Sequence, residues 1–249
     1  MKLTVISNTI VKIRPEPSST LKESEKSSIN AGVIYNVLAY KEEKEHYKVT
    51  LDGSTILGRN TVFFWKEHVS LGVNNNVKLG VKFFPQTDNK MQPDRTCNSS
   101  VHAMLLNYLK PGTITGDDQY IDWVFKLGDT TDHSIHTQLL RRFGIDSVWR
   151  TDLDFDDLDK SLENGYPVPI GIVHRGTESN PTGGGHIILV IGKNTEGYII
   201  HDPYGSILDN YTRDVQNGNG VVYSQRLLTN RWLLKKANNG WGRLITKVF

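Results

Sequence analysis

The chain has 249 residues, of which 37% are hydrophobic and 22% are charged. This composition is typical of a globular protein with a packed core and excludes a disordered chain. The formal net charge of +2 argues against a dedicated nucleic-acid binder. No apolar run is long enough to span a membrane, and the first nine residues hold too short an apolar stretch for a secretory signal. We therefore expect a monomer without a nucleic-acid or membrane partner, cytoplasmic in the producing cell until something else releases it.

Residues 1–71 are predicted to form a small all-β barrel. Short runs of β-branched and aromatic residues alternate with turn-forming residues, at positions 4–13, 32–40, 46–51 and 61–65. Asp52-Gly53 is expected to be a hairpin-type turn, and the charged stretch Lys22–Lys26 a solvated loop. The Asn- and Gly-containing segment Leu71–Asn76 follows and is predicted to be a linker.

Residues 78–249 are predicted to form a second domain of the α+β class. Apolar residues recur at helical spacing between Val101 and Leu109 and are followed by Pro111-Gly112, which predicts a helix that begins near Cys97. Further helices are expected at residues 122–127, 136–143 and 154–164. Strands are expected at residues 168–173, 186–191, 197–201 and 244–248, and residues 230–243 are expected to be late strands and a loop. Helices first and strands later is an α+β layout.

The single cysteine, Cys97, is the best candidate for a nucleophile. It lies between Thr96 and Asn98 in a polar stretch, at the predicted helix N-terminus and off the apolar stripe. A helix N-terminus supplies partial positive charge and free N–H groups, which lower the pKa of a nearby thiol and favour the reactive thiolate. The alternative is a buried structural cysteine, the commonest role of a free cysteine.

A thiol nucleophile needs a base, and His186 is the strongest candidate among the eight histidines. Three glycines precede it and an apolar strand follows, so we expect its ring to be held at a sheet edge. The alternative is a surface histidine after a flexible loop. Gly184 and Gly185, which could line a groove or form a mobile flap, and Asn98 are the predicted substrate-binding residues.

Asp202 is the candidate that orients the base. It follows the predicted strand at residues 197–201, and Pro203-Tyr204-Gly205 forms the turn after it. If the strands of His186 and Asp202 are neighbours, the carboxylate can hold the far ring nitrogen and steady the imidazolium. The alternative is a turn with no chemical role.

An acyl transfer also needs hydrogen-bond donors for the developing oxyanion. The backbone N–H of Cys97 is one candidate, and an upstream side-chain amide is the other. Gln86 is preferred because the aromatic residues just before it, Phe83 and Phe84, are expected to anchor it. Gln92 is the second choice.

Taken together, four segments resemble the C39-like group of papain-fold cysteine peptidases. They lie at residues 86–105, 165–171, 185–192 and 201–205, so the resemblance covers roughly residues 80–249. It implies Cys97 as nucleophile, His186 as general base and acid, Asp202 as orienting acid and Gln86 as oxyanion donor. Bacteriocin-processing members usually have Asp-Cys-Gly where this chain has Thr-Cys-Asn, and they are normally fused to a transporter. Leader-peptide processing is therefore not expected.

The N-terminal segment resembles a bacterial SH3-like domain, which usually binds cell wall or peptide. The residues that carry this likeness are Thr4–Pro15, Gly32–Tyr35 and Thr61–Val69. The alternative is a folded spacer. Such a module beside a cysteine peptidase implies an endolysin-like enzyme that cuts the peptide cross-links of bacterial peptidoglycan after release, with no cofactor. Two alternatives remain open: a papain-fold acyl or peptidyl transferase with the same three residues, and a non-catalytic cell-wall-binding protein.

Metal sites are weaker interpretations. His133 and His136 are three residues apart, and His174, His186 and His201 lie on late segments, but no HExxH or CxxC motif accompanies them. Residues 152–157 have the alternating acids of a calcium loop but lack the glycine needed at its sixth position. An acidic helix N-terminus explains them better. We therefore expect no metal in the site.

Overall fold

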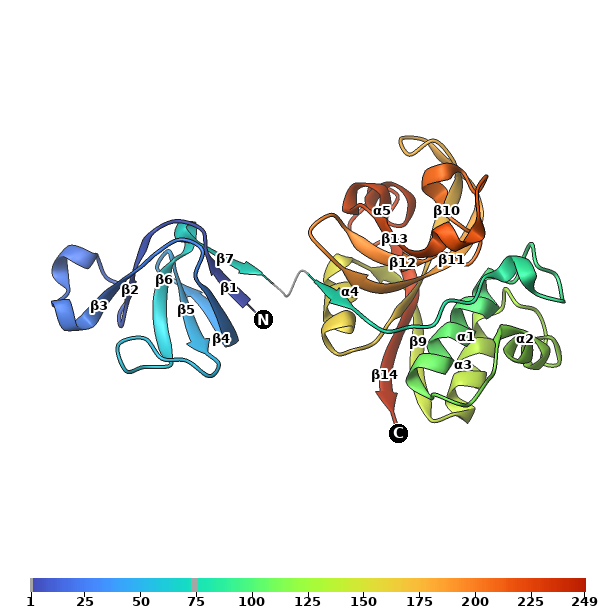
Figure 1. The fold of residues 1–249 in the computed structure, drawn as a ribbon, viewed down its shortest axis with the longest axis horizontal. Helices are drawn as coiled ribbons and strands as arrows, with labels where there is room; N and C mark the ends of the chain where they lie inside the picture. Colours follow the sequence, from blue (N-terminus) through green and yellow to red (C-terminus); the bar gives the residue numbers. More distant parts are fainter. Residues whose placement is uncertain (1, 73–75) are drawn as a thin grey trace. The chain divides into compact units, whose positions relative to one another are not determined.

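The computed structural model describes residues 2–72 and 76–249, and the chain divides into two compact units, residues 1–75 and 76–249. Figure 1 shows the first unit in blue to teal and the second from green to red. Each unit has its own antiparallel sheet and its own core, and the described α-helices belong to the second. The predicted α+β class is confirmed. The centre of the predicted linker, residues 73–75, lies outside the described residues. None of the described helices is long and apolar enough to cross a membrane.

The first unit is built on a seven-stranded antiparallel sheet with the order β3-β2-β6-β5-β4-β1-β7. Fully buried side chains such as Leu3, Val49 and Phe64 form its core. Two strands have the predicted bounds because β-branched and aromatic residues fill them between turn residues. The strands are β1 (Lys2–Val5), β2 (Thr9–Lys12), β3 (Lys26–Ile29), β4 (Ile34–Glu43), β5 (His46–Leu51), β6 (Thr61–Trp65) and β7 (Val69–Gly72).

The hairpin-type turn predicted at Asp52-Gly53 is not formed there, whereas Lys44-Glu45 form a two-residue hairpin turn. Glu43 pairs with His46 across it, and both turn residues have positive φ, of 50° and 59°. That conformation belongs to the two-residue turns that match strand twist, and Asn or Gly usually occupies it. The pairing of β4 with β5 therefore overrides the local preference. After Asp52 the chain forms a longer loop that reaches β6. The predicted solvated loop at residues 22–26 holds a short 3₁₀ turn before β3 begins.

The second unit has the sheet order β13-β12-β11-β10-β14-β9, and β8 pairs with β11 beside this path. All its neighbouring strands are antiparallel. The helices are α1 (Cys97–Leu109), α2 (Asp117–Phe125), α3 (His133–Arg142), α4 (Phe155–Glu163) and α5 (Gln225–Arg231). The strands are β8 (Val77–Lys78), β9 (Ile145–Leu153), β10 (Val168–Gly176), β11 (Pro181–Lys193), β12 (Tyr198–His201), β13 (Asn219–Tyr223) and β14 (Gly240–Val248).

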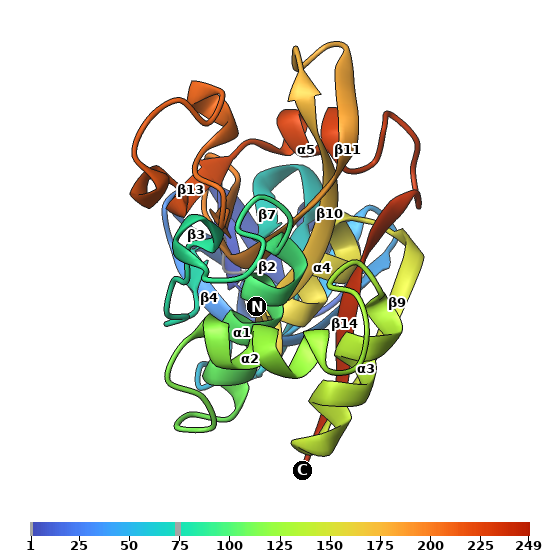
Figure 2. The same ribbon diagram turned by 90° about the vertical axis from the view of Figure 1, so that its right-hand side faces the viewer.

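Helices cover both faces of this sheet, as the two views in Figures 1 and 2 show. In β11, Ile187, Leu189 and Ile191 join the cluster formed with α1, α2 and α3, whereas Ile188 and Val190 join the cluster formed with α4 and α5. Alternate side chains of a strand point to opposite faces, so a strand buried on both faces must be apolar throughout. The run that follows His186 meets this requirement, and it fixes the position of that histidine at the start of the buried segment.

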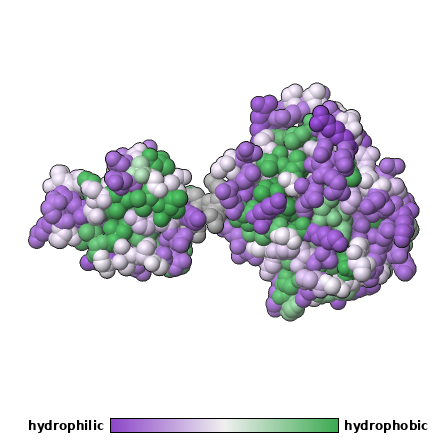
Figure 3. Space-filling model, in the orientation of Figure 1, coloured by the Kyte–Doolittle hydropathy of each residue, from purple (hydrophilic) through white to green (hydrophobic). Residues whose placement is uncertain are grey.

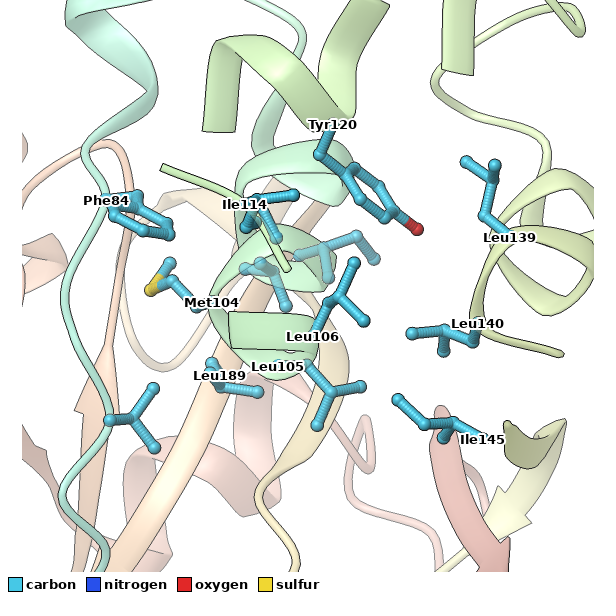
Figure 4. Close-up of a cluster of buried hydrophobic side chains, with 14 of the residues drawn as sticks. Phe84, Met104, Leu105, Leu106, Ile114, Tyr120, Leu139, Leu140, Ile145 and Leu189 are labelled. Atoms are coloured by element: carbon cyan, nitrogen blue, oxygen red, sulfur yellow. The ribbon is translucent and has the colours of Figure 1, made fainter. Parts of the chain in front are cut away.

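Helix α1 lies at the centre of the second unit and is buried on all sides over residues 98–106. Figure 4 shows Met104, Leu105 and Leu106 of this helix among side chains from the surrounding elements. The predicted helix and the burial of its apolar stripe are confirmed, but burial is not limited to that stripe. The polar residues of its first two turns, including Ser99 and His102, are also buried, each with hydrogen-bond partners. Cys97 is therefore attached to a rigid support.

Several elements of the second unit differ from the prediction. Strands β9 and β13 and helix α5 were not expected, and residues 230–243, expected to be strands and a loop, include the end of α5. Strand β11 begins at Pro181, so Gly184 and Gly185 belong to a paired strand rather than to a loop or flap. Helices α2 and α3 begin five and three residues earlier than predicted. For the strands, pairing with distant residues sets the boundary, which local periodicity does not record. Helices α3 and α5 instead begin after local caps, Asp132 and Ser224, whose side chains accept backbone N–H groups of the first turn.

Candidate active site

Cys97 is the first residue of α1, as predicted, and its thiol is half-buried. The preceding Thr96 is fully buried; its hydroxyl accepts a hydrogen bond from Asn89 Nδ2 at 2.9 Å and donates one to the Gln92 carbonyl at 3.2 Å. These contacts fix the turn that leads into the helix. The N–H of Ile187 in β11 points at Cys97 Sγ, with an N–S distance of 3.5 Å. The thiol therefore lies between a helix N-terminus and the central strand.

His186 and Asp202 form a buried pair beside this thiol. The Nε2 atom of His186 is 2.7 Å from Asp202 Oδ1, and both side chains are almost completely buried. They lie side by side because β11 and β12 are paired neighbours, with Leu189 opposite His201. Since Nε2 contacts the carboxylate, Nδ1 is the ring nitrogen that remains for the hydrogen bond with Cys97. The structure thus brings together the three residues in the predicted order.

Two tyrosines that the sequence does not point to, together with the predicted turn after Asp202, complete the surroundings of this residue. The hydroxyls of Tyr223 and Tyr211 donate hydrogen bonds to Asp202 Oδ2 at 2.7 and 3.2 Å. The backbone N–H of Tyr204 donates to Oδ1 at 3.1 Å. With His186, four donors surround a carboxylate that has no exposure to solvent. This satisfies the buried charge and fixes the direction in which it faces the imidazole.

The electrostatics favour a charged pair at Cys97 and His186. Burial alone would raise the pKa of the Cys97 thiol, but the His186 side chain and the N–H groups of Ile187 and Asn98 lower it below the usual value. Burial alone would lower the pKa of His186, but the Asp202 carboxylate and the thiolate raise it to about 10. Each group stabilises the charged form of the other. The arrangement can therefore hold a thiolate and an imidazolium near neutral pH.

Gln86 lies beside the turn that follows Asp202. Its backbone N–H donates to the Pro203 carbonyl at 2.8 Å, and its side chain is 99% buried. The side-chain Nε2 donates to the Pro93 carbonyl at 2.7 Å, while Oε1 accepts no hydrogen bond from any described residue. Gln92, the second choice, is exposed and accepts a hydrogen bond from Arg95. Of the two amides, only Gln86 is fixed in the interior next to the residues of the site.

The predicted substrate-binding residues lie in three different environments. Gly184 is exposed, and its carbonyl accepts a hydrogen bond at 2.8 Å from His174. Gly185 lies under the ring of Trp241, so closely that a Cβ atom there would overlap the indole. The side chain of Asn98 is buried, and its amide donates to the Thr130 carbonyl at 2.8 Å. Asn98 thus uses its side chain inside the domain, and the two glycines remain on the strand that leads to His186.

A second buried polar cluster, also absent from the sequence analysis, lies behind α1. Arg243 of β14 is fully buried; its Nε donates to His102 Nε2 at 2.8 Å, and its terminal nitrogens donate to Thr137, Ser147 and the His133 carbonyl. His102 in turn donates from Nδ1 to the Asn98 carbonyl at 2.7 Å. This cluster joins β14 to the first turn of α1, which carries the thiol.

The side chains considered as metal ligands have other partners. His136 contacts the Tyr120 hydroxyl and the Thr130 carbonyl, and His201 contacts the Val81 carbonyl. In the acidic segment, Asp154 caps α4 in a capping box with Asp157. Over residues 2–72 and 76–249, no group of three or more His, Cys, Asp or Glu side chains is arranged to hold a metal ion.

The comparisons with known proteins concern the second unit. A family model described as "Peptidase_C39 like family" matches residues 78–233. One similar solved structure, described as a C39-like peptidase from Bacillus anthracis, is 18% identical; it covers 70% of this chain and 99% of its own, with a TM-score of 0.48. No curated protein matches the chain. The matched range includes Cys97, His186 and Asp202.

Proposed function

The chain belongs to the C39-like peptidase family, and we propose that it is a cysteine peptidase that hydrolyses amide bonds through Cys97, His186 and Asp202. The observation that carries this proposal is the hydrogen-bonded line from Asp202 through His186 to Cys97 at the start of α1. A base held by an orienting acid beside a nucleophile is the arrangement that acyl transfer needs.

In the first half of the reaction, the Cys97 thiolate attacks the carbonyl carbon of the scissile amide. The negative charge moves to the carbonyl oxygen, where we assign two donors: the backbone N–H of Cys97, the first residue of α1, and the second N–H of Gln86 Nε2. His186 then gives its Nδ1 proton to the leaving nitrogen, the C–N bond breaks, and a thioester remains on Cys97.

In the second half, His186 is neutral and acts as a base. It takes a proton from water, the resulting hydroxide attacks the thioester carbonyl, and the carboxylic acid product leaves as the C–S bond breaks. The thiolate and the imidazolium are restored. Throughout, Asp202 holds the Nε2 side of the ring in place, and the hydroxyls of Tyr211 and Tyr223 fix the position of the Asp202 side chain by donating hydrogen bonds to Oδ2.

The pH dependence of alkylation tests this assignment directly. Cys97 is the only cysteine, so the uptake of iodoacetamide by the native protein reports on that thiol alone. We expect fast labelling at about pH 6, well below the ordinary thiol pKa of about 8.5, and loss of this fast labelling in His186→Ala. A rate that follows an ordinary thiol in both proteins would reject the catalytic assignment and favour a non-catalytic binding protein.

For the substrate, we propose peptide cross-links of bacterial peptidoglycan, reached by a monomer after its release from the producing cell. The first unit supports this proposal because its sequence resembles a wall-binding SH3-like domain and its surface offers a site. A groove of about 500 Å³ lies between Ile10, Lys12, Trp65 and His68. Figure 3 shows hydrophobic residues gathered on the visible face of this unit, and such patches mark interaction surfaces.

Isolated cell walls provide the test of the substrate. We expect the reduced, active protein to lower the turbidity of a wall suspension and to release new amino groups, and the variant Cys97→Ala to pellet with the walls without cutting them. Activity on a model peptide without any effect on walls would reject the peptidoglycan assignment while keeping the peptidase. New amide products in the presence of an added amine would identify a transferase instead.

A further inference from the structure

His174 and Arg175, at the end of β10, lie beside the proposed catalytic base. The ring centroid of His174 is 5.2 Å from that of His186, and its Nδ1 contacts the Gly184 carbonyl. The pairing of β10 with β11 shifts register between Val173 and Arg175. Such an irregularity redirects the side chains that follow it. Figure 2 shows this hairpin reaching beyond the rest of the sheet.

The guanidinium of Arg175 is held by aromatic rings. It lies 5.9 Å from the ring centroid of Tyr204 and 5.8 Å from that of Tyr211, within the range of a cation–π contact. The same two rings pack against His186, with centroid distances of 6.2 and 6.0 Å. Arg175 and the imidazole of His186 therefore pack against the same two tyrosine rings.

Arg175 is an exposed residue whose backbone is held by its neighbours. Gly183 on the opposite strand has a φ of +89°, and a Cβ atom there would come within 2.7 Å of Arg175 Cγ. The aliphatic stem of Arg175 thus lies against a position where a side chain would collide with it. The buried Arg231 of α5 donates hydrogen bonds at 2.8–2.9 Å to the carbonyls of Val173, Arg175 and Gly176. A fixed side chain loses less entropy when it binds a ligand.

The charge of Arg175 is not neutralised within the protein. In the part of the chain that the structure describes, its guanidinium forms no ion pair and lies against the rings of Tyr204 and Tyr211. The nearest carboxylate of the site, Asp202, is buried and already accepts four hydrogen bonds. Glu178, on the same hairpin, pairs with Arg226. The five N–H groups of Arg175 remain available to a carboxylate, which a guanidinium binds in bidentate geometry.

We propose that Arg175 binds a carboxylate of the substrate on the leaving-group side of the scissile amide. The chemistry fixes which side of the scissile amide Arg175 faces. His186 protonates the leaving nitrogen and must contact it, so the side chains around His186 lie beside the leaving-group half of the substrate. This inference rests on the proposed peptidase function. The preferred substrates release an amine that carries its own carboxylate: a C-terminal amino acid, or a diamino acid joined through its side-chain nitrogen.

A pair of alkylating reagents tests the subsite without a known substrate. N-iodoacetylglycine carries a carboxylate at the far end of an amide, and its glycinamide counterpart has the same shape without the charge. We expect Cys97 of the wild-type protein to react at least about five times faster with the acid than with the amide, and Arg175→Gln to lose this preference. The control is Arg213→Gln, which removes the same charge from an exposed position two residues from Tyr211 and should keep the preference.

The outcomes separate the two proposals. An unchanged preference for the acid reagent in Arg175→Gln would overturn the subsite. An equal loss of this preference in Arg175→Gln and Arg213→Gln would also overturn it, because that result indicates a diffuse positive field. Failure of both reagents to react below pH 7 would instead reject the activated thiol, and the inference with it. Peptide substrates provide a second measurement. The ratio of kcat/KM for a peptide with a free C-terminal carboxylate to kcat/KM for the same peptide with a C-terminal amide should fall at least fivefold in Arg175→Gln. A substrate joined through the side-chain nitrogen of lysine, with its α-carboxyl free or amidated, then identifies which of the two leaving groups is preferred.

Discussion

Two buried clusters of histidine in the same domain have opposite electrostatics. His186, beside Asp202, has its pKa raised to about 10 although it is buried, because the carboxylate stabilises the imidazolium. His136, behind α1, has its pKa lowered to about 3, because burial dominates and its partners are a carbonyl and a hydroxyl. Burial alone favours the neutral ring, and the Asp202 carboxylate together with the Cys97 thiolate reverses this preference at His186. We assign a catalytic role to the charged cluster of His186 and Asp202, and a structural role to the neutral cluster behind α1.

The largest effect on this difference between the two clusters is expected from Asp202→Asn, which removes the carboxylate while keeping the shape of the side chain. We expect kcat/KM to fall about 10³- to 10⁴-fold, because an amide neither fixes the tautomer of His186 nor stabilises its charge. The pKa of His186 should fall clearly below its wild-type value of about 10, because only the Cys97 thiolate then opposes the effect of burial. Kinetics on a model peptide measure the first effect and histidine NMR the second. A variant that kept full activity would show that Asp202 has no part in the reaction.

The neutral cluster predicts a loss of stability in acid. His102, His133 and His136 all have pKa values lowered mainly by burial, to about 4 for His133 and about 3 for His136. Below the unfolded pKa of about 6.5, the unfolded chain binds protons that the native state does not. The free energy of unfolding should therefore decrease from pH 6.5 down to about pH 3, by roughly 3–5 kcal/mol from His136 alone at one pKa unit per 1.4 kcal/mol.

Urea unfolding at a series of pH values, followed by tryptophan fluorescence, measures this loss. The double variant His102→Gln/His136→Gln cannot take up these protons, so its stability should depend less steeply on pH between 6.5 and 4 than that of the wild type. The same slope in both proteins would show that the rings are already protonated in the native state.

Arg243 offers a smaller change in the same cluster. In Arg243→Met, the Nε2 atom of His102 and the carbonyl of His133 lose their donors, whereas the hydroxyls of Thr137 and Ser147 can turn to other partners. We expect a loss of about 2–4 kcal/mol in the free energy of unfolding. The pKa of His102 should rise, because Nε2 is then free to bind a proton. Exposed Arg142→Met provides the control for loss of charge, and an equal effect there would contradict the assignment.

The sequence predicts the reacting groups better than their surroundings. Cys97, His186 and Asp202 are recognisable because their chemistry restricts residue type and chain order, and because polar residues at the edges of apolar runs are conspicuous. Tyr211 and Tyr223 were missed because their hydroxyls reach Asp202 from a loop and from the edge strand β13, whose place is set only by the tertiary fold.

The same reason explains the missed cluster behind α1 and several misplaced elements. Arg243 and His102 are 141 residues apart, and no local pattern relates them. Arginine is rarely fully buried, so the sequence alone gives no reason to place Arg243 in the interior. By contrast, β5 and β6 were predicted to the residue, because a run of β-branched and aromatic side chains between turn residues is a local signal that tertiary contacts here reinforce.

The smallest expected effect comes from removing one of the two tyrosine hydroxyls that donate to Asp202. Tyr211→Phe removes one hydrogen bond of 3.2 Å to Asp202 and leaves the ring that packs against His186 and Arg175. We expect kcat/KM to fall only about threefold to tenfold, the value of a single hydrogen bond of about 1 kcal/mol. The bond from Tyr223 is shorter, at 2.7 Å, but its oxygen also accepts the N–H of Ile207, so Tyr223→Phe should lower both activity and stability. If Tyr211→Phe instead abolished activity without unfolding the protein, its hydroxyl would have to contact the substrate, and the orientation of His186 by Asp202 would no longer explain its position.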